Sequence, residues 1–278
     1  MHTQLTLGFS PCPNDTFMFY PLVHGLVKAG DFCFKEQLED VETLNRMAMQ
    51  SLLDISKVSY AALGFIRDEY VLLRSGSALG RGCGPLLVAG NPMEFDVLPQ
   101  KTIAIPGAYT TACMLLRLFN PRLHQLVEMP FDKIMPAVAS GAVDAGVIIH
   151  ESRFTYQTIG LHKLLDLGSW WEAETGLPIP LGGIVARRSL GTDAILTIEQ
   201  ALRAAVDYSR HNPAAAARYI SSHAQEMSSE VCAAHIGLYV NDFSSNLGEE
   251  GEQAICELLQ RAEAAGIVPA CNMSLFAE

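Results

Sequence analysis

Residues 143–151 have the sequence Val-Asp-Ala-Gly-Val-Ile-Ile-His-Glu, an apolar run with a single histidine near its end. Small and β-branched residues dominate the run, and Gly141 precedes it. This pattern is typical of a buried strand in a parallel sheet rather than of a helix of the same length. Ligands of open α/β sheets bind outside the carboxyl ends of such strands. His150 is therefore a candidate site residue, although on this run alone a histidine that merely ends a strand is an equally good interpretation.

The segments around this run have counterparts earlier in the chain. A predicted strand, a loop with proline and a capped helix occur at residues 5–23 and again at 101–119. A predicted helix, a strand led by aspartate and a polar end occur at residues 41–60 and again at 134–150. Because the order and the polar ends match in both halves, we predict an α/β protein with two similar lobes that face each other across a cleft.

The repeat also aligns individual residues. When Asp54 is set on Asp144, Tyr60 falls opposite His150. Each of these two residues stands at the carboxyl end of a predicted strand, which is where a ligand would lie. The repeat therefore makes the end of each strand a candidate wall of the cleft.

Two predicted helix N-termini add candidate binding groups. The loop Ser10-Pro11-Cys12-Pro13-Asn14-Asp15 ends the first strand, and Asn14 or Asp15 is the expected N-cap of the helix that follows. Thr110, followed by Thr111, is the expected N-cap of the second helix. Free backbone N–H groups at a helix start can bind an anionic or carbonyl oxygen. Cys12 is a weak candidate nucleophile, because no histidine or basic residue stands near it in sequence.

Two apolar strands are predicted to connect the lobes, at Leu86–Ala89 and at Ile184–Arg187. They divide the chain into a larger lobe of residues 1–88 and 185–278 and a smaller lobe of residues 89–184. The chain beyond Arg187 is predicted to be helical. We expect these C-terminal helices to pack on the first lobe without contributing chemistry, although Asn241-Asp242 between them could reach the rim of the cleft.

Composition excludes several classes of function. The 278 residues carry a formal net charge of -11, and no cluster of lysine and arginine offers nucleic acid a basic face. Seven cysteines are scattered and never stand at a Cys-x-x-Cys spacing, so we predict neither a disulfide framework nor a metal site. No apolar run reaches the roughly 18 residues of a membrane span. The first residues lack the features of a secretory signal, which predicts a cytoplasmic protein.

Five separated stretches together resemble the 1,4-dihydroxy-6-naphthoate synthase family of the futalosine route to menaquinone. The resemblance covers nearly the whole chain, and the ordered set is more specific than any single stretch. The stretches are Ser10-Pro11-Cys12-Pro13-Asn14-Asp15-Thr16-Phe17, Asp40-Val41-Glu42-Thr43-Leu44-Asn45, Lys57-Val58-Ser59-Tyr60, Tyr109-Thr110-Thr111-Ala112 and Ile149-His150-Glu151-Ser152-Arg153-Phe154-Thr155-Tyr156.

The resemblance implies a type II periplasmic-binding-protein-like fold that works as a cytoplasmic carbon–carbon lyase without metal or organic cofactor. The implied substrate is cyclic dehypoxanthinyl futalosine, and the implied products are 1,4-dihydroxy-6-naphthoate and dihydroxyacetone. The family's proton acceptor falls on His150, whose ordinary pKa of about 6.5 suits a base at neutral pH. The implied substrate-binding residues are Lys57, Val58, Ser59, Tyr60, Thr110 and Thr111, and the first helix N-terminus adds Asn14.

Two other functions remain open at this stage. Two-lobed proteins of this fold are often solute-binding proteins of transporters, a class that the missing signal sequence disfavours. A sister enzyme of the same pathway, such as a chorismate dehydratase, would share the fold, but we do not expect it to carry both the Ser10–Asp15 loop and the His150 segment. The sequence does not predict an oligomeric state.

Overall fold

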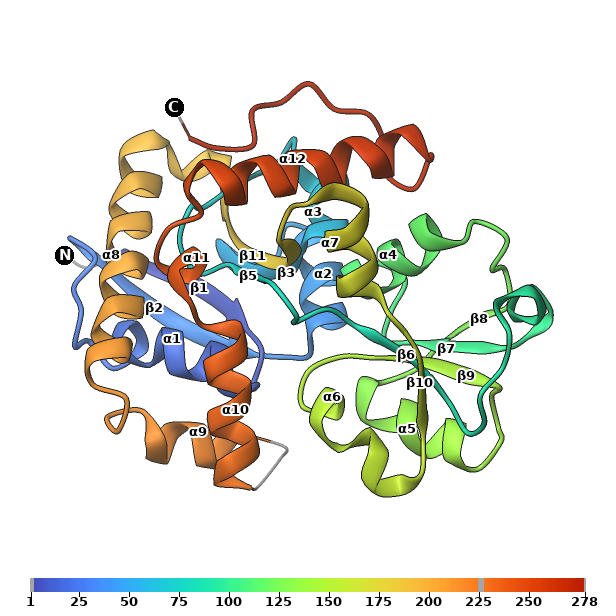
Figure 1. The fold of residues 1–278 in the computed structure, drawn as a ribbon. Helices are drawn as coiled ribbons and strands as arrows, with labels where there is room; N and C mark the ends of the chain where they lie inside the picture. Colours follow the sequence, from blue (N-terminus) through green and yellow to red (C-terminus); the bar gives the residue numbers. More distant parts are fainter. Residues whose placement is uncertain (1–2, 225–227, 278) are drawn as a thin grey trace.

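The computed structural model describes residues 3–224 and 228–277. It has two lobes, each built on its own β-sheet, and the first and last segments of the described chain both lie on the larger lobe (Figure 1). No helix within these residues is both long enough and apolar enough to cross a membrane. The two-lobed α/β architecture predicted from the repeat is confirmed.

The larger lobe contains a six-stranded sheet with the order β2-β1-β3-β11-β4, and β5 pairs with β11 beside this path. Strand β1 pairs in parallel with both of its neighbours, whereas β11 runs antiparallel to β3. The strands are β1 (Thr3–Phe9), β2 (Phe32–Leu38), β3 (Ile55–Ser59), β4 (Tyr70–Leu72), β5 (Ala78–Gly80) and β11 (Ile179–Arg187).

The smaller lobe contains a five-stranded sheet with the order β10-β6-β9-β7-β8. Here β7 pairs in parallel with β8 and β9, and β6 runs antiparallel to β9. The first four strands of the larger sheet, β2-β1-β3-β11, thus correspond to β8-β7-β9-β6. The strands are β6 (Leu86–Ala89), β7 (Ile103–Ile105), β8 (Leu126–Glu128), β9 (Ala145–Ile148) and β10 (His162–Asp166).

Helices cover the faces of both sheets (Figure 1). Those of the larger lobe are α1 (Pro13–Val23), α2 (Val41–Met49), α3 (Tyr60–Ile66), α8 (Thr192–His211), α9 (Ala217–His223), α10 (Ser229–Tyr239), α11 (Asp242–Ser245) and α12 (Gly248–Ala264). Those that follow strands of the smaller lobe are α4 (Thr111–Phe119), α5 (Phe131–Ala139), α6 (Ser152–Thr155) and α7 (Leu167–Thr175). Short 3₁₀ turns span Phe95–Gln100, Tyr156–Ile159 and Arg188–Leu190.

An aspartate joins the two parallel strands at the same place in each lobe. Asp54, just before β3, accepts hydrogen bonds from the backbone N–H and the hydroxyl of Thr6 in β1, each at 2.8 Å. Asp144, just before β9, accepts a 2.9 Å bond from the N–H of Thr102, which precedes β7. These bonds fix the register of the strand pairs, and they confirm the predicted alignment of Asp54 with Asp144.

The predicted lobe boundaries fall inside two strands. Residues 88 and 89 lie within β6, and residues 184 and 185 lie within β11. Strand β6 pairs with β9 and β10, whereas β11 pairs with β3, β4 and β5. We therefore propose that the lobes divide in the loops before these strands, at about residues 81–85 and 176–178.

One helix start differs from the prediction. Helix α1 begins at Pro13 with Cys12 as N-cap residue, and no side chain caps it. Proline suits the first helical position because its missing N–H has no partner there in any helix. The predicted cap at Asn14 or Asp15 is therefore wrong, and the carboxylate of Asp15 is available for other contacts.

Candidate functional site

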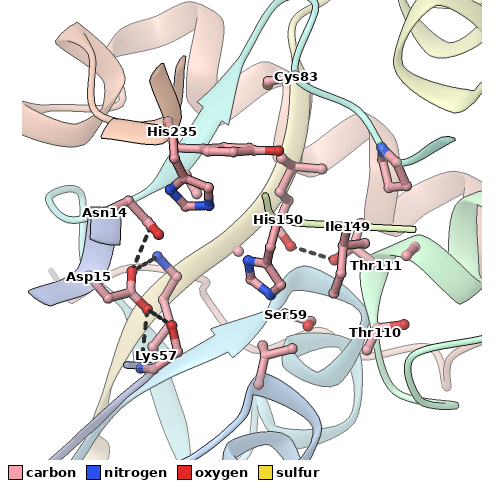
Figure 2. Close-up of a pocket in the computed structure, with 18 residues that line it drawn as sticks. Asn14, Asp15, Lys57, Ser59, Cys83, Thr110, Thr111, Ile149, His150 and His235 are labelled. Carbon is pink, nitrogen blue, oxygen red and sulfur yellow. Dashed lines mark hydrogen bonds and ion pairs between the residues drawn. The ribbon is translucent and has the colours of Figure 1, made fainter. Parts of the chain in front are cut away.

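A cavity lies between the two lobes, and groups from both line it (Figure 2). The larger lobe contributes the start of α1, the end of β3, β11 and α10, and the smaller lobe contributes the start of α4 and the end of β9. The lining residues are Ser10, Asn14, Asp15, Val41, Lys57, Ser59, Ala78, Cys83, Pro85, Thr110, Thr111, Ala112, Ile149, His150, Leu181, Gly182, His235 and Tyr239. Of the predicted site residues, six meet here: Asn14, Lys57, Ser59, Thr110, Thr111 and His150.

His150 reaches the cavity through an unusual backbone conformation. Strand β9 ends at Ile148, and His150 follows in a turn with φ of 56°, in the left-handed region that few side-chain-bearing residues adopt. Its ring lies edge-on to Phe131, with centroids 5.0 Å apart. Across the cleft, Cys12 Sγ lies 3.5 Å from Nδ1 of His150. The neighbour that orients the imidazole is therefore Cys12, 138 residues away in sequence.

Burial sets the protonation states of this pair. It lowers the pKa of His150 below the ordinary value, and the nearby carboxylates of Glu151 and Asp15 only partly offset this shift. Burial, together with the charge of Glu151, raises the pKa of Cys12 well above the ordinary value of a thiol. At neutral pH His150 is thus an uncharged base and Cys12 an uncharged thiol, so Cys12 lacks the thiolate form that a nucleophile needs.

A buried ion pair forms one polar end of the cavity. Lys57 Nζ lies 3.0 Å from Asp15 Oδ1, and both side chains are almost fully buried. Asp15 also accepts bonds from the N–H and the hydroxyl of Ser10, and Asn14 Nδ2 donates to it at 2.8 Å. Since a buried charge is costly unless it is paired and hydrogen-bonded, these contacts hold Lys57 and Asp15 in place.

The hydroxyls of Thr110 and Thr111 are occupied within the protein. Thr110 caps α4 by accepting from the N–H of Cys113, as predicted, and donates to the carbonyl of Gly107. Thr111 donates to the carbonyl of Leu181 at 2.6 Å and accepts from the N–H of Ala61, which ties α4 to the larger lobe. Their hydroxyl hydrogens are therefore not available to a ligand, whereas backbone N–H groups at the start of α4 have no partner within the helix.

Ser59 is held differently. Its hydroxyl accepts a 3.1 Å bond from Nδ2 of Asn45, and its N–H donates to Oδ1 of the same side chain. Asn45 Nδ2 also lies 3.2 Å from the carbonyl of Tyr109 in the smaller lobe. Because the Ser59 hydroxyl acts here as an acceptor, its hydrogen remains free to donate to a bound molecule.

The other two predicted binding residues do not line the cavity. Tyr60 is fully buried in the core, where its hydroxyl lies 2.8 Å from Ser77 Oγ, and Val58 is fully buried as well. Burial raises the pKa of Tyr60, which keeps the phenol uncharged. Strand alternation explains the arrangement, because Lys57 and Ser59 lie on the cavity side of β3 and Val58 on the other side.

The C-terminal helices also line the cavity, which the sequence did not predict. His235 and Tyr239, one turn apart on α10, both line it, and their rings lie 4.6 Å apart. His235 stands in the apolar stretch Val231–Tyr239, where a lone histidine is usually a core residue. No local sequence signal distinguishes it.

Cys12, His150 and Glu151 together offer the kinds of ligand atom that a thiophilic cation prefers. One ligand atom from each of Cys12, His150 and Glu151 can be chosen such that all lie within 4.8 Å of one another. One carboxylate oxygen of Glu151 is buried and has no hydrogen-bond partner among the described residues. Sulfur, imidazole and carboxylate are the usual zinc ligands. A cation bound there would occupy a nitrogen of His150. The expectation that the enzyme needs no metal stays a prediction.

Comparisons with known proteins agree on a family. A family model described as "Menaquinone biosynthesis" matches residues 5–264. A 1,4-dihydroxy-6-naphthoate synthase from Thermus thermophilus is 52% identical, and one from Streptomyces coelicolor is 49% identical. Each alignment covers 98% of both chains.

Solved structures show the same fold. A protein of Archaeoglobus fulgidus superposes with a TM-score of 0.90 at 35% identity, over 95% of this chain and 98% of that one. An alkanesulfonate-binding protein from Xanthomonas axonopodis, bound to MOPS, superposes with a TM-score of 0.73 over 97% and 96% of the two chains. At 13% identity the second likeness concerns the fold alone, which is that of periplasmic binding proteins.

Proposed function

Because the chain belongs to the menaquinone-biosynthesis family, with relatives that are 1,4-dihydroxy-6-naphthoate synthases, we propose that it forms this product in the interlobe cavity, with His150 as general base. The environment of the His150 ring supports this role. The imidazole is uncharged, lies at the cavity wall, and has Nδ1 engaged by Cys12, which leaves Nε2 as the nitrogen that can take a substrate proton.

The proposed substrate is cyclic dehypoxanthinyl futalosine. His150 removes one proton, and the electron pair that stays behind forms a new π bond as the carbon–carbon bond to the sugar remnant breaks. The pair released from the broken bond stays on one of the two fragments, which takes back the proton held by His150, so that no other reactant is consumed. Dihydroxyacetone leaves and the aromatic naphthoate remains. General base catalysis contributes about 100-fold to 10,000-fold, so a cavity that orients the substrate must supply the rest of the rate enhancement.

We propose that the substrate carboxylate binds at the start of α4. The partial positive charge of a helix N-terminus and its free N–H groups favour an anion. Ala112 and Thr111 line the cavity at this point, and the Ser59 hydroxyl can donate from the opposite lobe. Backbone groups rather than the threonine hydroxyls make the contact, because those hydroxyls bond to Gly107 and Leu181.

Turnover tests the assignment directly. The purified protein, incubated with cyclic dehypoxanthinyl futalosine, should generate a naphthoate chromophore and dihydroxyacetone. Incubation with chorismate serves as the control for a sister pathway enzyme, and tight binding of either compound without turnover would indicate a solute-binding protein. Absence of product from the first compound contradicts the proposal.

The pH dependence of kcat/KM tests the base. A histidine whose pKa is lowered stays uncharged to a more acidic pH than an ordinary one. We therefore expect kcat/KM to be constant near neutrality and to fall with a single apparent pKa below the ordinary value of about 6.5. An acid limb above that value, or none, would point to a different group.

We also propose that the protein works in the cytoplasm, since its curated relatives are biosynthetic enzymes. Fractionation of cells that express the full chain, followed by immunodetection, would test this location.

A further inference from the structure

His235 is a polar residue of the cavity wall, and its ring lies beside those of Tyr239 and His150. It lies on α10, which packs against α1 and β5, and only 1% of its surface is exposed. Its ring centroid lies 6.1 Å from that of His150, and the two ring planes differ by 24° (Figure 2). The residue is thus buried beside the proposed base, although it comes from a helix remote in sequence.

Neither ring nitrogen of His235 has a hydrogen-bond partner among the residues that the structure describes. Buried polar atoms are nearly always hydrogen-bonded, because a buried donor or acceptor without a partner loses its bonds to water and gains nothing. A phenylalanine or leucine would fill the same space without this cost. The unpartnered nitrogens therefore indicate that a bound molecule supplies the missing bonds.

The charge state of the ring restricts what that molecule offers. Burial, with smaller contributions from His150 and Lys57, lowers the pKa of His235 to about 3. The ring is therefore uncharged at neutral pH and presents one N–H donor and one acceptor. A hydroxyl can satisfy either ring nitrogen because it both donates and accepts, and a carbonyl oxygen can accept from the N–H.

We propose that His235 hydrogen-bonds to a hydroxyl or carbonyl oxygen of the substrate, adjacent to the atom that His150 deprotonates. This inference rests on the proposed function. The 6.1 Å between the rings places neighbouring atoms of one ligand within reach of both. When His150 removes its proton, negative charge develops on the adjacent oxygen, and the His235 N–H stabilises it as a neutral hydrogen-bond donor. No proton is transferred to or from His235.

His235→Phe tests the role, because it keeps a ring of similar shape and removes both nitrogens. We expect kcat to fall roughly 100-fold, the effect of losing one such donor, with a smaller change in KM. The melting temperature of the ligand-free protein should stay the same or rise, because an unpaired polar group has left the interior. His211→Phe, at the exposed end of α8, is the matched control and should leave kcat unchanged.

Two conservative variants separate hydrogen bonding from packing. The amide of Gln or Asn can replace one ring nitrogen of the histidine. At least one of the variants His235→Gln and His235→Asn should therefore have a kcat about tenfold or more above that of His235→Phe. A His235→Phe variant with wild-type kcat per folded molecule overturns the proposal. So does a result in which neither amide variant exceeds the Phe variant.

A measurement on the wild-type protein covers the case in which His235→Phe does not fold. In spectra of protein with ¹⁵N-labelled histidine, addition of the naphthoate product, which carries two hydroxyls, should shift the ring nitrogen signals of His235. Signals that do not move at saturating product overturn the proposal. Wild-type protein that makes no product from cyclic dehypoxanthinyl futalosine contradicts the proposed function instead, so the two failures are distinguishable.

Discussion

The two lobes share a strand order and an aspartate link, yet they differ at the residue that follows the third strand of each repeat. In the larger lobe, Tyr60 opens α3 directly after β3, and its side chain is fully buried in the core. In the smaller lobe, His150 stands in a left-handed turn after β9, and its ring lines the cavity. The aligned residues thus have opposite surroundings on matching scaffolds.

The backbone after each strand explains the difference. Ser59 is extended and α3 begins at the next residue, so Tyr60 takes a helical conformation and packs inward. After β9, two residues precede Glu151, and the left-handed conformation of His150 costs about 1 kcal/mol relative to an ordinary one. The local backbone after the strand, rather than the sheet, therefore places Tyr60 in the core and His150 at the cavity.

Replacement of His150 should have the largest effect. His150→Asn keeps approximate size and hydrogen bonding but cannot take up a proton at neutral pH. We expect kcat to fall at least about 100-fold, while affinity for the naphthoate product changes little. Steady-state kinetics and calorimetric titration with product check both parts. If weaker binding explained the whole loss, His150 would be a positioning residue and the lobes would differ less than we infer.

Loss of the orienting thiol should have a smaller effect. Cys12→Ala removes the contact at Nδ1 of His150 but leaves the base itself. A hydrogen bond of this kind is worth about 1 kcal/mol, which corresponds to a fall in kcat of roughly fivefold to tenfold. Cys12→Ser should lie between the alanine variant and wild type. Complete loss of turnover in both variants, with the fold intact, would instead indicate that Cys12 acts as a nucleophile.

The contact between Cys12 and His150 also shows where sequence-based prediction stops. The repeat, the cap at Thr110 and the candidate base followed from local patterns and from the family resemblance. Three other features depend on residues far apart in the chain. They are the contact of Cys12 with His150, the ion pair between Asp15 and Lys57, and the position of His235 beside His150. Local periodicity carries no information on such contacts. No histidine is near Cys12 in sequence, but His150 is next to it in the folded protein.

The fate of Tyr60 illustrates the same limit. The alignment with His150 and the family resemblance both made it a predicted site residue, but the early start of α3 turns its side chain into the core. The sequence at the end of a strand does not show whether a helix or a turn follows, and this choice sets the direction of the next side chain. The register of the repeat was predictable, and the side-chain direction at its last residue was not.

Tyr60→Phe sharpens this point. The change removes a hydroxyl that lies 2.8 Å from Ser77 Oγ and leaves the fully buried Ser77 without that partner. We expect the free energy of unfolding, from urea denaturation, to fall by about 1–2 kcal/mol, with kcat changed less than about twofold. A tenfold loss of kcat in folded protein would mean that Tyr60 takes part in turnover, so that it would no longer differ in role from His150.

The smallest expected effect concerns the aspartate links, which look alike but differ in exposure. Asp144 accepts from the N–H of Thr102 and pairs with Lys101 at 3.1 Å, and 38% of its side chain is exposed. Asp54 accepts two bonds from Thr6 and is less exposed. Water screens the exposed pair, so Asp144→Asn should cost only a few tenths of a kcal/mol at neutral pH, and Asp54→Asn about 1 kcal/mol.

The pH dependence of stability separates the charge of Asp144 from its position. The bond from Thr102, followed by the contact with Lys101, lowers the pKa of this carboxyl below its ordinary value. The unfolded chain therefore takes up the proton first as pH falls, so this stabilisation is complete above the unfolded pKa of about 3.9 and disappears as pH drops through the folded pKa. The difference between wild type and Asp144→Asn in urea denaturation should accordingly shrink below about pH 4. A difference that persists unchanged in acid would mean that the shape of the side chain, and not its charge, joins the two strands of the smaller lobe.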